Sequence, residues 1–174
     1  MIILICGFMG SGKTTLSKKW KEEVLKEQKA QWEFADLDQI IFEKYKEENE
    51  TGLSEVILRL GWQKFREYES NELNRLLHDE DELVISLGGG SLESKESRQN
   101  ISKNSNVKMV FLDTSFEECW RRVSQEEGRP LVESGKDSLK ELYESRLPQY
   151  KMADVSLKSS ESGITLSQLI TRLN

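Results

Sequence analysis

The residues with the clearest chemical potential lie near the N-terminus, in a glycine-rich segment that ends in a lysine and a threonine. Residues 7–14 read Gly-Phe-Met-Gly-Ser-Gly-Lys-Thr and fit the pattern G-x-x-x-x-G-K-[ST] at every fixed position. Three glycines let the backbone turn sharply and present N–H groups to phosphate oxygens at the start of a helix. We expect the Lys13 ammonium to reach the β- and γ-phosphates of a nucleotide, and the Thr14 hydroxyl to contribute to a Mg²⁺ site. The segment therefore predicts a nucleotide-phosphate site; the alternative is a glycine-rich turn that binds nothing.

Two acidic residues, Asp36 and Asp38, follow the second apolar run of the chain. If Leu37 points into the core, both carboxylates can lie at the carboxyl end of a sheet, where open α/β sheets bind ligands. One carboxylate could then help to hold the Mg²⁺ water shell, while the other orients or deprotonates a hydroxyl that attacks the γ-phosphate. An acidic helix cap is the alternative interpretation of this pair.

A triple glycine and four arginines complete the set of candidate site residues. Gly88, Gly89 and Gly90 follow the third apolar run, where they either let a ligand approach the backbone or form a flexible turn. A guanidinium binds carboxylates and phosphates with two parallel hydrogen bonds, although any single arginine can equally be a surface or ion-paired residue. The arginines that stand apart from the lysine-rich surface are Arg66, Arg122, Arg129 and Arg146.

The elements that must position these residues alternate between apolar runs and helical stretches. This alternation predicts a parallel sheet covered by helices on both faces. The five runs expected to be strands are Ile2–Cys6, Trp32–Ala35, Leu83–Leu87, Val107–Leu112 and Ala153–Leu157. Helices are expected from Lys13 to about Gln28, through Leu53 to His78 with a break or bend at Gly61, over Ser138–Leu147 and over Leu166–Leu173.

The segment from Glu126 to Asp137 interrupts the apolar periodicity. It contains two glycines, a proline and mixed charges, and it is longer than most connections in a compact domain. Because Arg129 lies inside it, we expect a mobile lid over about residues 126–137 that closes on bound phosphates.

Taken in order, these motifs resemble those of shikimate kinase over nearly the whole chain. The motifs that carry the resemblance are the phosphate loop, Asp36-x-Asp38, Gly61 followed by Phe65-Arg66-x-x-Glu69, the triple glycine, Arg129-Pro130-Leu131, and Arg146-x-x-x-Tyr150 with Ala153-Asp154. The resemblance implies a P-loop fold like that of nucleoside-monophosphate kinases, a single three-layer α/β domain over residues 1–174 with five parallel strands. It also implies transfer of the γ-phosphate of ATP to the 3-hydroxyl of shikimate, in the biosynthesis of chorismate and the aromatic amino acids.

The resemblance also implies a role for each candidate residue. The catalytic residues would be Lys13, Asp38 and Arg129. Shikimate would be bound by Asp38, Arg66, Gly88, Gly89, Gly90 and Arg146. A helical segment over about residues 37–79 would be the substrate-binding part of the domain. ATP and its phosphates would be bound by Gly10, Ser11, Gly12, Lys13, Thr14, Thr15, Arg122 and Arg129. Thr14, with Asp36 acting through water, would hold Mg²⁺. The sequence departs from the family's pattern at Trp62, where an acidic residue is common, and near Ser159–Gly163 on the adenine side.

Composition limits the classes of function. The chain has 174 residues, 36% hydrophobic and 32% charged, which is typical of a folded globular enzyme rather than a disordered chain. The net charge of −6 argues against general nucleic-acid binding, and no apolar run reaches the length of a membrane span. With two cysteines in no metal-binding spacing and a strand at the very start, we expect a cytoplasmic monomer without a targeting peptide. The alternatives are a P-loop kinase of another small hydroxy acid, such as gluconate, and a non-catalytic nucleotide-binding switch.

Overall fold

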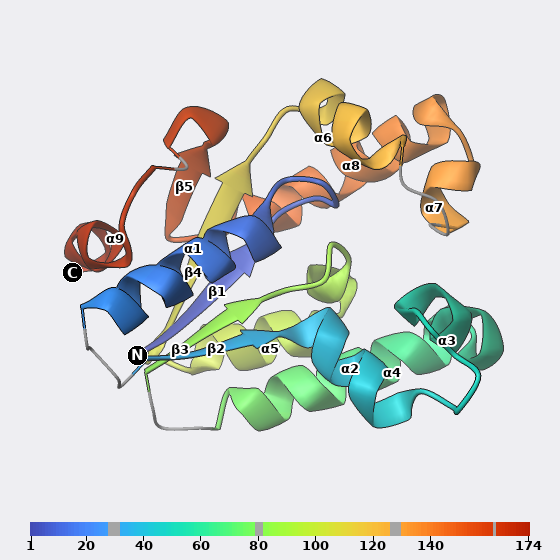
Figure 1. Cartoon of the computed structure of the whole chain (residues 1–174), viewed down its shortest axis with the longest axis horizontal. Coiled ribbons are helices and arrows are strands. Elements are labelled where there is room, and N and C mark those ends of the chain that lie inside the picture. Colours follow the sequence, from blue (N-terminus) through green and yellow to red (C-terminus); the bar gives the residue numbers. More distant parts are fainter. Residues whose placement is uncertain (28–31, 79–81, 126–129, 162) are drawn as a thin grey trace.

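The computed structural model describes residues 1–27, 32–78, 82–125, 130–161 and 163–174. Its centre is a five-stranded parallel sheet in the order β2-β3-β1-β4-β5 (Figure 1). The strands are β1 (Ile2–Cys6), β2 (Trp32–Asp36), β3 (Glu82–Ser86), β4 (Val107–Asp113) and β5 (Val155–Lys158). The central strand β1 aligns Ile2 with Leu83 of β3 on one side and with Val107 of β4 on the other. The five predicted strands are therefore confirmed: β1 has the predicted ends, and the ends of the other strands lie within two residues of the prediction.

Helices cover both faces of the sheet, because successive side chains of a strand point to opposite faces. Ile3 and Ile5 of β1 pack with α1 (Lys13–Lys26) and α9 (Leu166–Leu173) in one apolar cluster. Ile2 and Leu4 belong to the second cluster, which the other long helices cover. Those helices are α2 (Leu37–Tyr45), α3 (Leu53–Leu60), α4 (Trp62–Leu76), α5 (Lys95–Lys103), α6 (Phe116–Val123) and α8 (Lys136–Tyr150).

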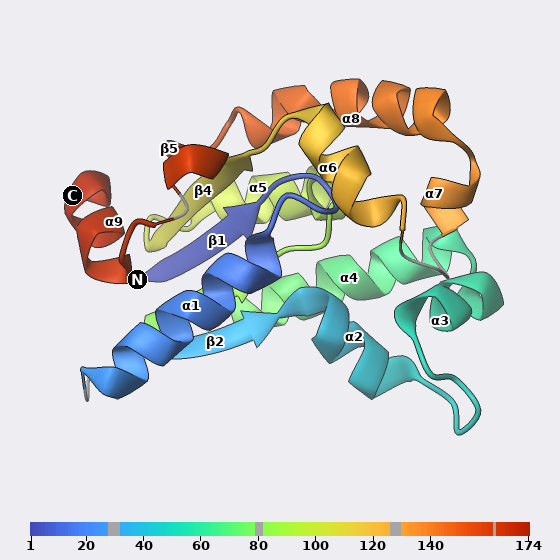
Figure 2. The same cartoon turned by 45° about the horizontal axis from the view of Figure 1, so that its top comes forward.

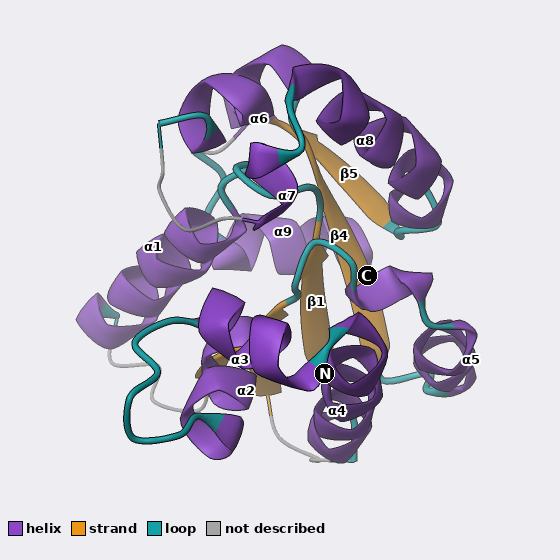
Figure 3. Cartoon of the chain, turned by 90° about the vertical axis from the view of Figure 1, so that its right-hand side faces the viewer, coloured by secondary structure: helices purple, strands orange, loops and turns teal. Residues whose placement is uncertain are grey.

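Two helical groups flank the carboxyl end of the sheet. Figures 1 and 3 show α2, α3 and α4 on one side of this end and α6, α8 and the short α7 (Pro130–Glu133) on the other. The turned view in Figure 2 shows the same separation. The phosphate loop lies between β1 and α1, and the segment after β3 contains the short helix η1 (Ser91–Glu93). A second short helix, η2 (Ser159–Glu161), follows β5. The fold thus brings the loops after β1, β2 and β3 together.

Several boundaries differ from the sequence prediction for local reasons. Gly61 separates α3 from α4 with a φ of 78°, so the predicted break is real. Helix α8 continues past Leu147 to Tyr150 although Pro148 has no N–H to donate to the preceding turn, and the Lys151 N–H still donates to the Leu147 carbonyl oxygen at 3.0 Å. Strand β5 begins at Val155 rather than Ala153, because the Asp154 side chain accepts the Met109 backbone N–H at 2.7 Å.

The predicted lid is not a loop throughout the part that the structure describes. Residues 130–133 form α7, and α8 begins at Lys136, two residues before its predicted start. Leu131 and Val132 pack against the core cluster that covers one face of the sheet. Part of the expected lid is therefore helical and contacts the core, while its mobility stays a prediction. Residues 126–129, including Arg129, lie outside the described residues. Among the described helices, none combines the length and the apolar content that crossing a bilayer requires.

Candidate active site

The phosphate loop is held in shape by glycine and by contact with α6. Gly10 has a φ of 73°, and a Cβ there would lie 2.7 Å from Val123 Cγ1 and 2.8 Å from the carbonyl oxygen of Cys119. Only glycine fits this position, because both the backbone angle and the space exclude a side chain. The Ser11 hydroxyl is buried and has no hydrogen-bond partner within the described residues. The loop therefore requires glycine at Gly10 and has one buried hydroxyl without a hydrogen-bond partner within the described residues.

The Lys13 side chain folds back over this loop. Its ammonium donates hydrogen bonds of 2.9 Å to the carbonyl oxygens of both Gly7 and Phe8. Burial lowers the pKa of Lys13, and the negative charge of Asp38 is the strongest opposing influence. This geometry holds a cation above the loop, where phosphate oxygens would meet the helix N-terminus.

Thr14 and Asp36 meet beside the loop. The Thr14 hydroxyl donates to Asp36 Oδ2 at 3.0 Å, and Asp36 also caps α2 by accepting the Gln39 N–H at 3.3 Å. Asp36 therefore lies beside the phosphate loop and also caps α2. Hydroxyl and carboxylate oxygens are the ligands that Mg²⁺ prefers, and Mg²⁺ retains several waters when it has few protein ligands. The two residues therefore fit a magnesium site.

Asp38 lies in the first turn of α2, and the preceding Leu37 is completely buried in the core as predicted. The pKa of Asp38 is raised to about 6, chiefly by burial and in smaller part by the like charges of Glu69 and Asp36. Lys13 and Arg66 oppose this shift. A carboxylate whose pKa lies near neutral pH can accept a proton and release it, which is what general-base catalysis requires.

The glycines after β3 allow acidic and basic side chains to approach the backbone. A Cβ at Gly88 would lie 2.6 Å from Asp38 Oδ1 and 2.7 Å from Glu69 Oε1. A Cβ at Gly90 would lie 2.0 Å from the nearest guanidinium nitrogen of Arg66 and 2.8 Å from that of Arg146. The chain's own side chains therefore require glycine at positions 88 and 90, and the approach of a ligand to this backbone stays a prediction.

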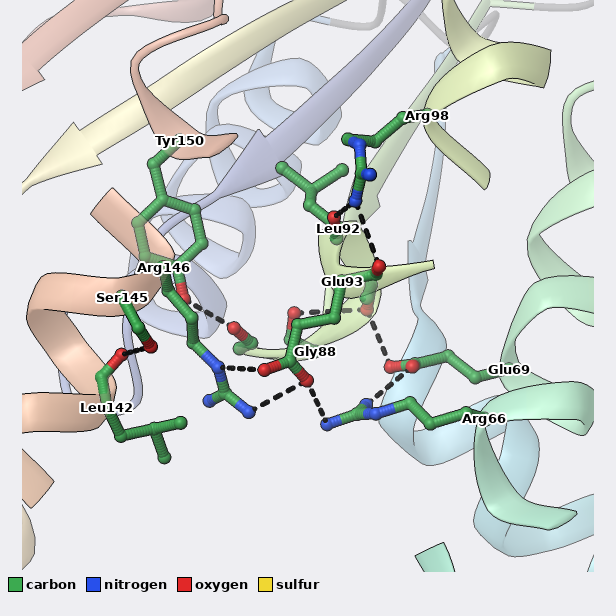
Figure 4. Close-up of polar contacts among 12 residues, drawn as sticks. Arg66, Glu69, Gly88, Leu92, Glu93, Arg98, Leu142, Ser145, Arg146 and Tyr150 are labelled. Atoms are coloured by element: carbon green, nitrogen blue, oxygen red, sulfur yellow. Dashed lines mark hydrogen bonds and ion pairs between the residues drawn. The ribbon is translucent and has the colours of Figure 1, made fainter. Parts of the chain in front are cut away.

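Arg66 of α4 and Arg146 of α8 converge over Gly90 from opposite sides (Figure 4). Arg66 donates to Glu69 Oε2 at 2.5 Å, and its guanidinium lies 5.2 Å from the centre of the Trp62 ring. Trp62, the departure from the family's pattern, therefore stacks against one of the two candidate acid-binding arginines. Arg146 is nearly buried, and both arginines form ion pairs with Glu93.

Two adjacent clefts contain the candidate residues. The first, of about 740 Å³, is lined by the phosphate loop, Lys13, Thr14, Thr15, Asp36 and Arg122 among others. The second, of about 610 Å³, is lined by Arg66, Arg146, the three glycines, Trp62 and Leu131 among others. Met9, Asp38 and Gly89 line both clefts. The structure therefore places Asp38 at the junction of a cleft lined by the phosphate loop and a cleft lined by two arginines.

Arg122 lies beside the phosphate loop, where it donates to the Gly10 carbonyl oxygen at 2.9 Å and pairs with Glu118. Its predicted place on the nucleotide side is consistent with this position in the first cleft.

Sequence reasoning assigned no role to four residues that the structure places in the site. Ser91 donates to Glu69 Oε1 at 2.6 Å, and the Tyr150 hydroxyl donates to the Gly89 carbonyl oxygen. Glu69 and Tyr150 stand at fixed spacings from Arg66 and Arg146, and these spacings are the local signal that could have identified them. Glu93 and Ser91 carry no such signal beyond their place after the triple glycine.

Comparison with known proteins is consistent with this geometry. A family model described as shikimate kinase matches residues 9–173. A shikimate kinase of Persephonella marina is 32% identical over 157 residues, covering 90% of this chain and 88% of that protein. A shikimate kinase of Lactococcus lactis subsp. cremoris is 33% identical over 168 residues, covering 92% of each chain. The solved structure of Acinetobacter baumannii shikimate kinase in complex with shikimate has a TM-score of 0.80 at 27% identity, covering 99% of this chain and 91% of that one.

Proposed function

The chain belongs to the shikimate kinase family and is an ATP-dependent kinase, and we propose that it phosphorylates the 3-hydroxyl of shikimate with the residues described above. In this reaction the hydroxyl oxygen forms a bond to the γ-phosphorus of ATP as the bond from that phosphorus to the β–γ bridging oxygen breaks. ADP leaves with the bridging oxygen, and the hydroxyl proton passes to a base. Shikimate 3-phosphate is the second product.

We assign the recognition of the acid to Arg66 and Arg146. Shikimate carries one carboxylate and three hydroxyls, and two guanidiniums that converge over Gly90 match a single carboxylate well. Because the three glycines line the second cleft without side chains of their own, the ring hydroxyls would be held close to the backbone. These contacts position the acceptor and supply part of the rate enhancement by orientation alone.

Asp38 is the proposed base. In its ionised form it would accept a hydrogen bond from the attacking hydroxyl and take its proton as the bond to phosphorus forms. The pKa of about 6 leaves this carboxylate mostly ionised at slightly alkaline pH while keeping it a stronger base than an exposed aspartate.

The phosphate loop, Lys13 and Arg122 would hold the phosphates and stabilise charge on the transferred group. Thr14 and Asp36 would hold Mg²⁺, the aspartate through water. When bound, this ion would neutralise charge on the β- and γ-phosphate oxygens. Thr15 follows Thr14 in the first turn of α1 and lines the same cleft.

The single observation that carries the proposal is the position of Asp38 on the wall that the two clefts share. A phosphoryl donor in one cleft and an acid in the other would meet at this carboxylate. A nucleotide-binding switch has no need of a second cleft lined by two arginines.

The test is an ADP-release assay with ATP and Mg²⁺, run without acceptor, with shikimate and with gluconate. We expect ADP release that requires shikimate and is not seen without an acceptor. Turnover only with gluconate would assign the enzyme to another hydroxy acid, and ADP release that no acceptor changes would favour the switch.

A further inference from the structure

The carboxylate of Glu93 lies between the two arginines that the proposed function assigns to the acid group of the substrate (Figure 4). Glu93 Oε1 accepts from Arg146 Nε at 3.0 Å, and Oε2 accepts from Arg146 Nη2 at 3.1 Å. Oε2 also lies 3.3 Å from Arg66 Nη2. This is the paired, fork-like geometry with which a guanidinium binds any carboxylate. The chain itself therefore supplies a carboxylate at the place where a carboxylate ligand would bind.

Glu93 differs from Glu69, the other acidic partner of Arg66. The Glu69 side chain is only 3% exposed and also accepts a hydrogen bond from Ser91, so it is a fixed part of the structure. The Glu93 side chain is 40% exposed, and within the described residues its carboxylate contacts only the two arginines. A half-exposed carboxylate can exchange its ion pairs for water at low cost. Glu93 can therefore leave the arginines, whereas Glu69 stays.

Arg146 needs an anionic partner, because its side chain is only 6% exposed. A buried charge without a partner is strongly unfavourable. Glu93 provides this partner when no acid is bound, and a substrate carboxylate can replace it without leaving the guanidinium unpaired.

The backbone of Glu93 is held in place, so the exchange needs only rotation of the side chain. The Glu93 N–H donates to the Gly90 carbonyl oxygen at 2.9 Å, and the Glu93 carbonyl oxygen accepts from Arg98 at 2.9 Å. The Cα of Glu93 therefore stays beside the site whether or not its carboxylate is in contact with the arginines.

From this arrangement we propose that Glu93 is an internal competitor of the substrate and sets both the affinity and the acid specificity of the site. The proposal rests on the proposed function, since it takes Arg66 and Arg146 as the acid-binding pair. A carboxylate ligand must displace Glu93, and it can do so because it replaces both ion pairs. A neutral analogue cannot satisfy Arg146, so Glu93 stays in place and the analogue gains nothing from the pair.

The test compares the wild-type protein with Glu93→Gln, which keeps the shape of the side chain and removes its charge. The control is Glu96→Gln, which removes the same charge from an exposed position three residues away in α5. Calorimetric titration with shikimate and with its methyl ester gives Kd for each protein, and thermal melting verifies that each is folded. Glu93→Gln lacks the ion pairs that shikimate must displace, and it also lacks the repulsion between the carboxylates of Glu93 and shikimate. Its Kd for shikimate should therefore be lower than that of the wild-type protein by about 3- to 10-fold. The Kd for the ester, and both Kd values of Glu96→Gln, should stay at the wild-type level.

Each other outcome overturns a defined part of the reasoning. A higher Kd for shikimate in Glu93→Gln would mean that Glu93 positions the arginines rather than competing for them. An unchanged Kd, or an equal gain for the ester, would also refute the competition. Glu93→Ala, which removes the side-chain acceptor altogether, must also have a lower Kd for shikimate than the wild-type protein. If the wild-type protein does not bind shikimate at all, the proposed function itself fails and this inference fails with it.

Discussion

Replacing Asp38 by asparagine should make the protein more stable and less active at once. The carboxylate lies on the wall of the two clefts, beside Glu69 and Asp36, and its pKa is raised from 3.8 to about 6. Such a shift means that the folded protein disfavours the ionised form by about 3 kcal/mol relative to the unfolded chain. An asparagine side chain has nearly the same shape without the charge, so Asp38→Asn should recover about 3 kcal/mol at alkaline pH. For a chain of this length, that corresponds to a rise in Tm of about 6 to 12 °C.

The stabilisation should depend on pH in a specific direction. Below about pH 4, Asp38 is protonated in both the folded and the unfolded wild-type protein, and the two proteins should differ little. As the pH rises from about 4 to about 6, the unfolded chain loses this proton more readily than the folded one, so the wild-type protein loses stability relative to the variant. Above about pH 6 to 7 the difference should reach its full size and remain constant.

Urea unfolding of both proteins at a series of pH values measures this difference, and ADP release with shikimate measures the activity. Loss of a general base should lower turnover by about 10² to 10⁴-fold. Asp36→Asn is the comparison variant: asparagine is an equally good helix cap, and this variant should recover only a small part of the stability, because Asp36 is a minor cause of the raised pKa of Asp38. The reasoning is refuted if Asp38→Asn is no more stable than the wild-type protein at alkaline pH, or if its advantage shrinks as the pH rises from about 4 to about 7.

Three further substitutions test the other roles. Lys13→Ala should abolish phosphoryl transfer while circular dichroism stays unchanged, since the ammonium that neutralises the transferred charge is lost; near-normal turnover would contradict this role. Arg66→Lys keeps the charge but loses the planar fork, so calorimetry should give weaker binding of shikimate and unchanged binding of ATP; equal losses for both ligands would indicate a structural role. Asp36→Asn should raise the Mg²⁺ concentration needed for half-maximal rate, and excess Mg²⁺ should recover part of the rate, which it should not do for Asp38→Asn. Rescue in the opposite order would exchange the two roles.

The sequence predicts those parts of the fold that depend on local pattern. The strand Ile2–Cys6 and the helix Leu166–Leu173 begin and end at the predicted residues, because an apolar run and a capped amphipathic segment are local signals. The break at Gly61 was predictable for the same reason. The apolar pattern did not identify α5 and α6, and α2 was expected only within the helical segment over about residues 37–79 that the resemblance implies, because these helices are short and their stability comes largely from packing against the rest of the chain.

In the candidate site, too, local pattern was predictable and tertiary contacts were not. The phosphate loop and the two aspartates were predictable because residue type and spacing specify their chemistry. The position of Glu93 was not, because its partners Arg66 and Arg146 lie far from it in the sequence, on two different helices. The raised pKa of Asp38 likewise depends on Glu69, which only tertiary folding brings close.

The wall that the two clefts share also bears on inhibitor design. Met9, Asp38 and Gly89 line both clefts, so one molecule with an anionic chain at one end and a cyclic carboxylic acid at the other could occupy both. Binding at one end would raise the effective concentration of the other end, and the affinity would exceed that of either fragment. The linker would pass Asp38 and should therefore carry a neutral hydrogen-bond donor there. The acid end would also have to displace Glu93, so an affinity measured on Glu93→Gln would overestimate the affinity of the same compound for the wild-type enzyme.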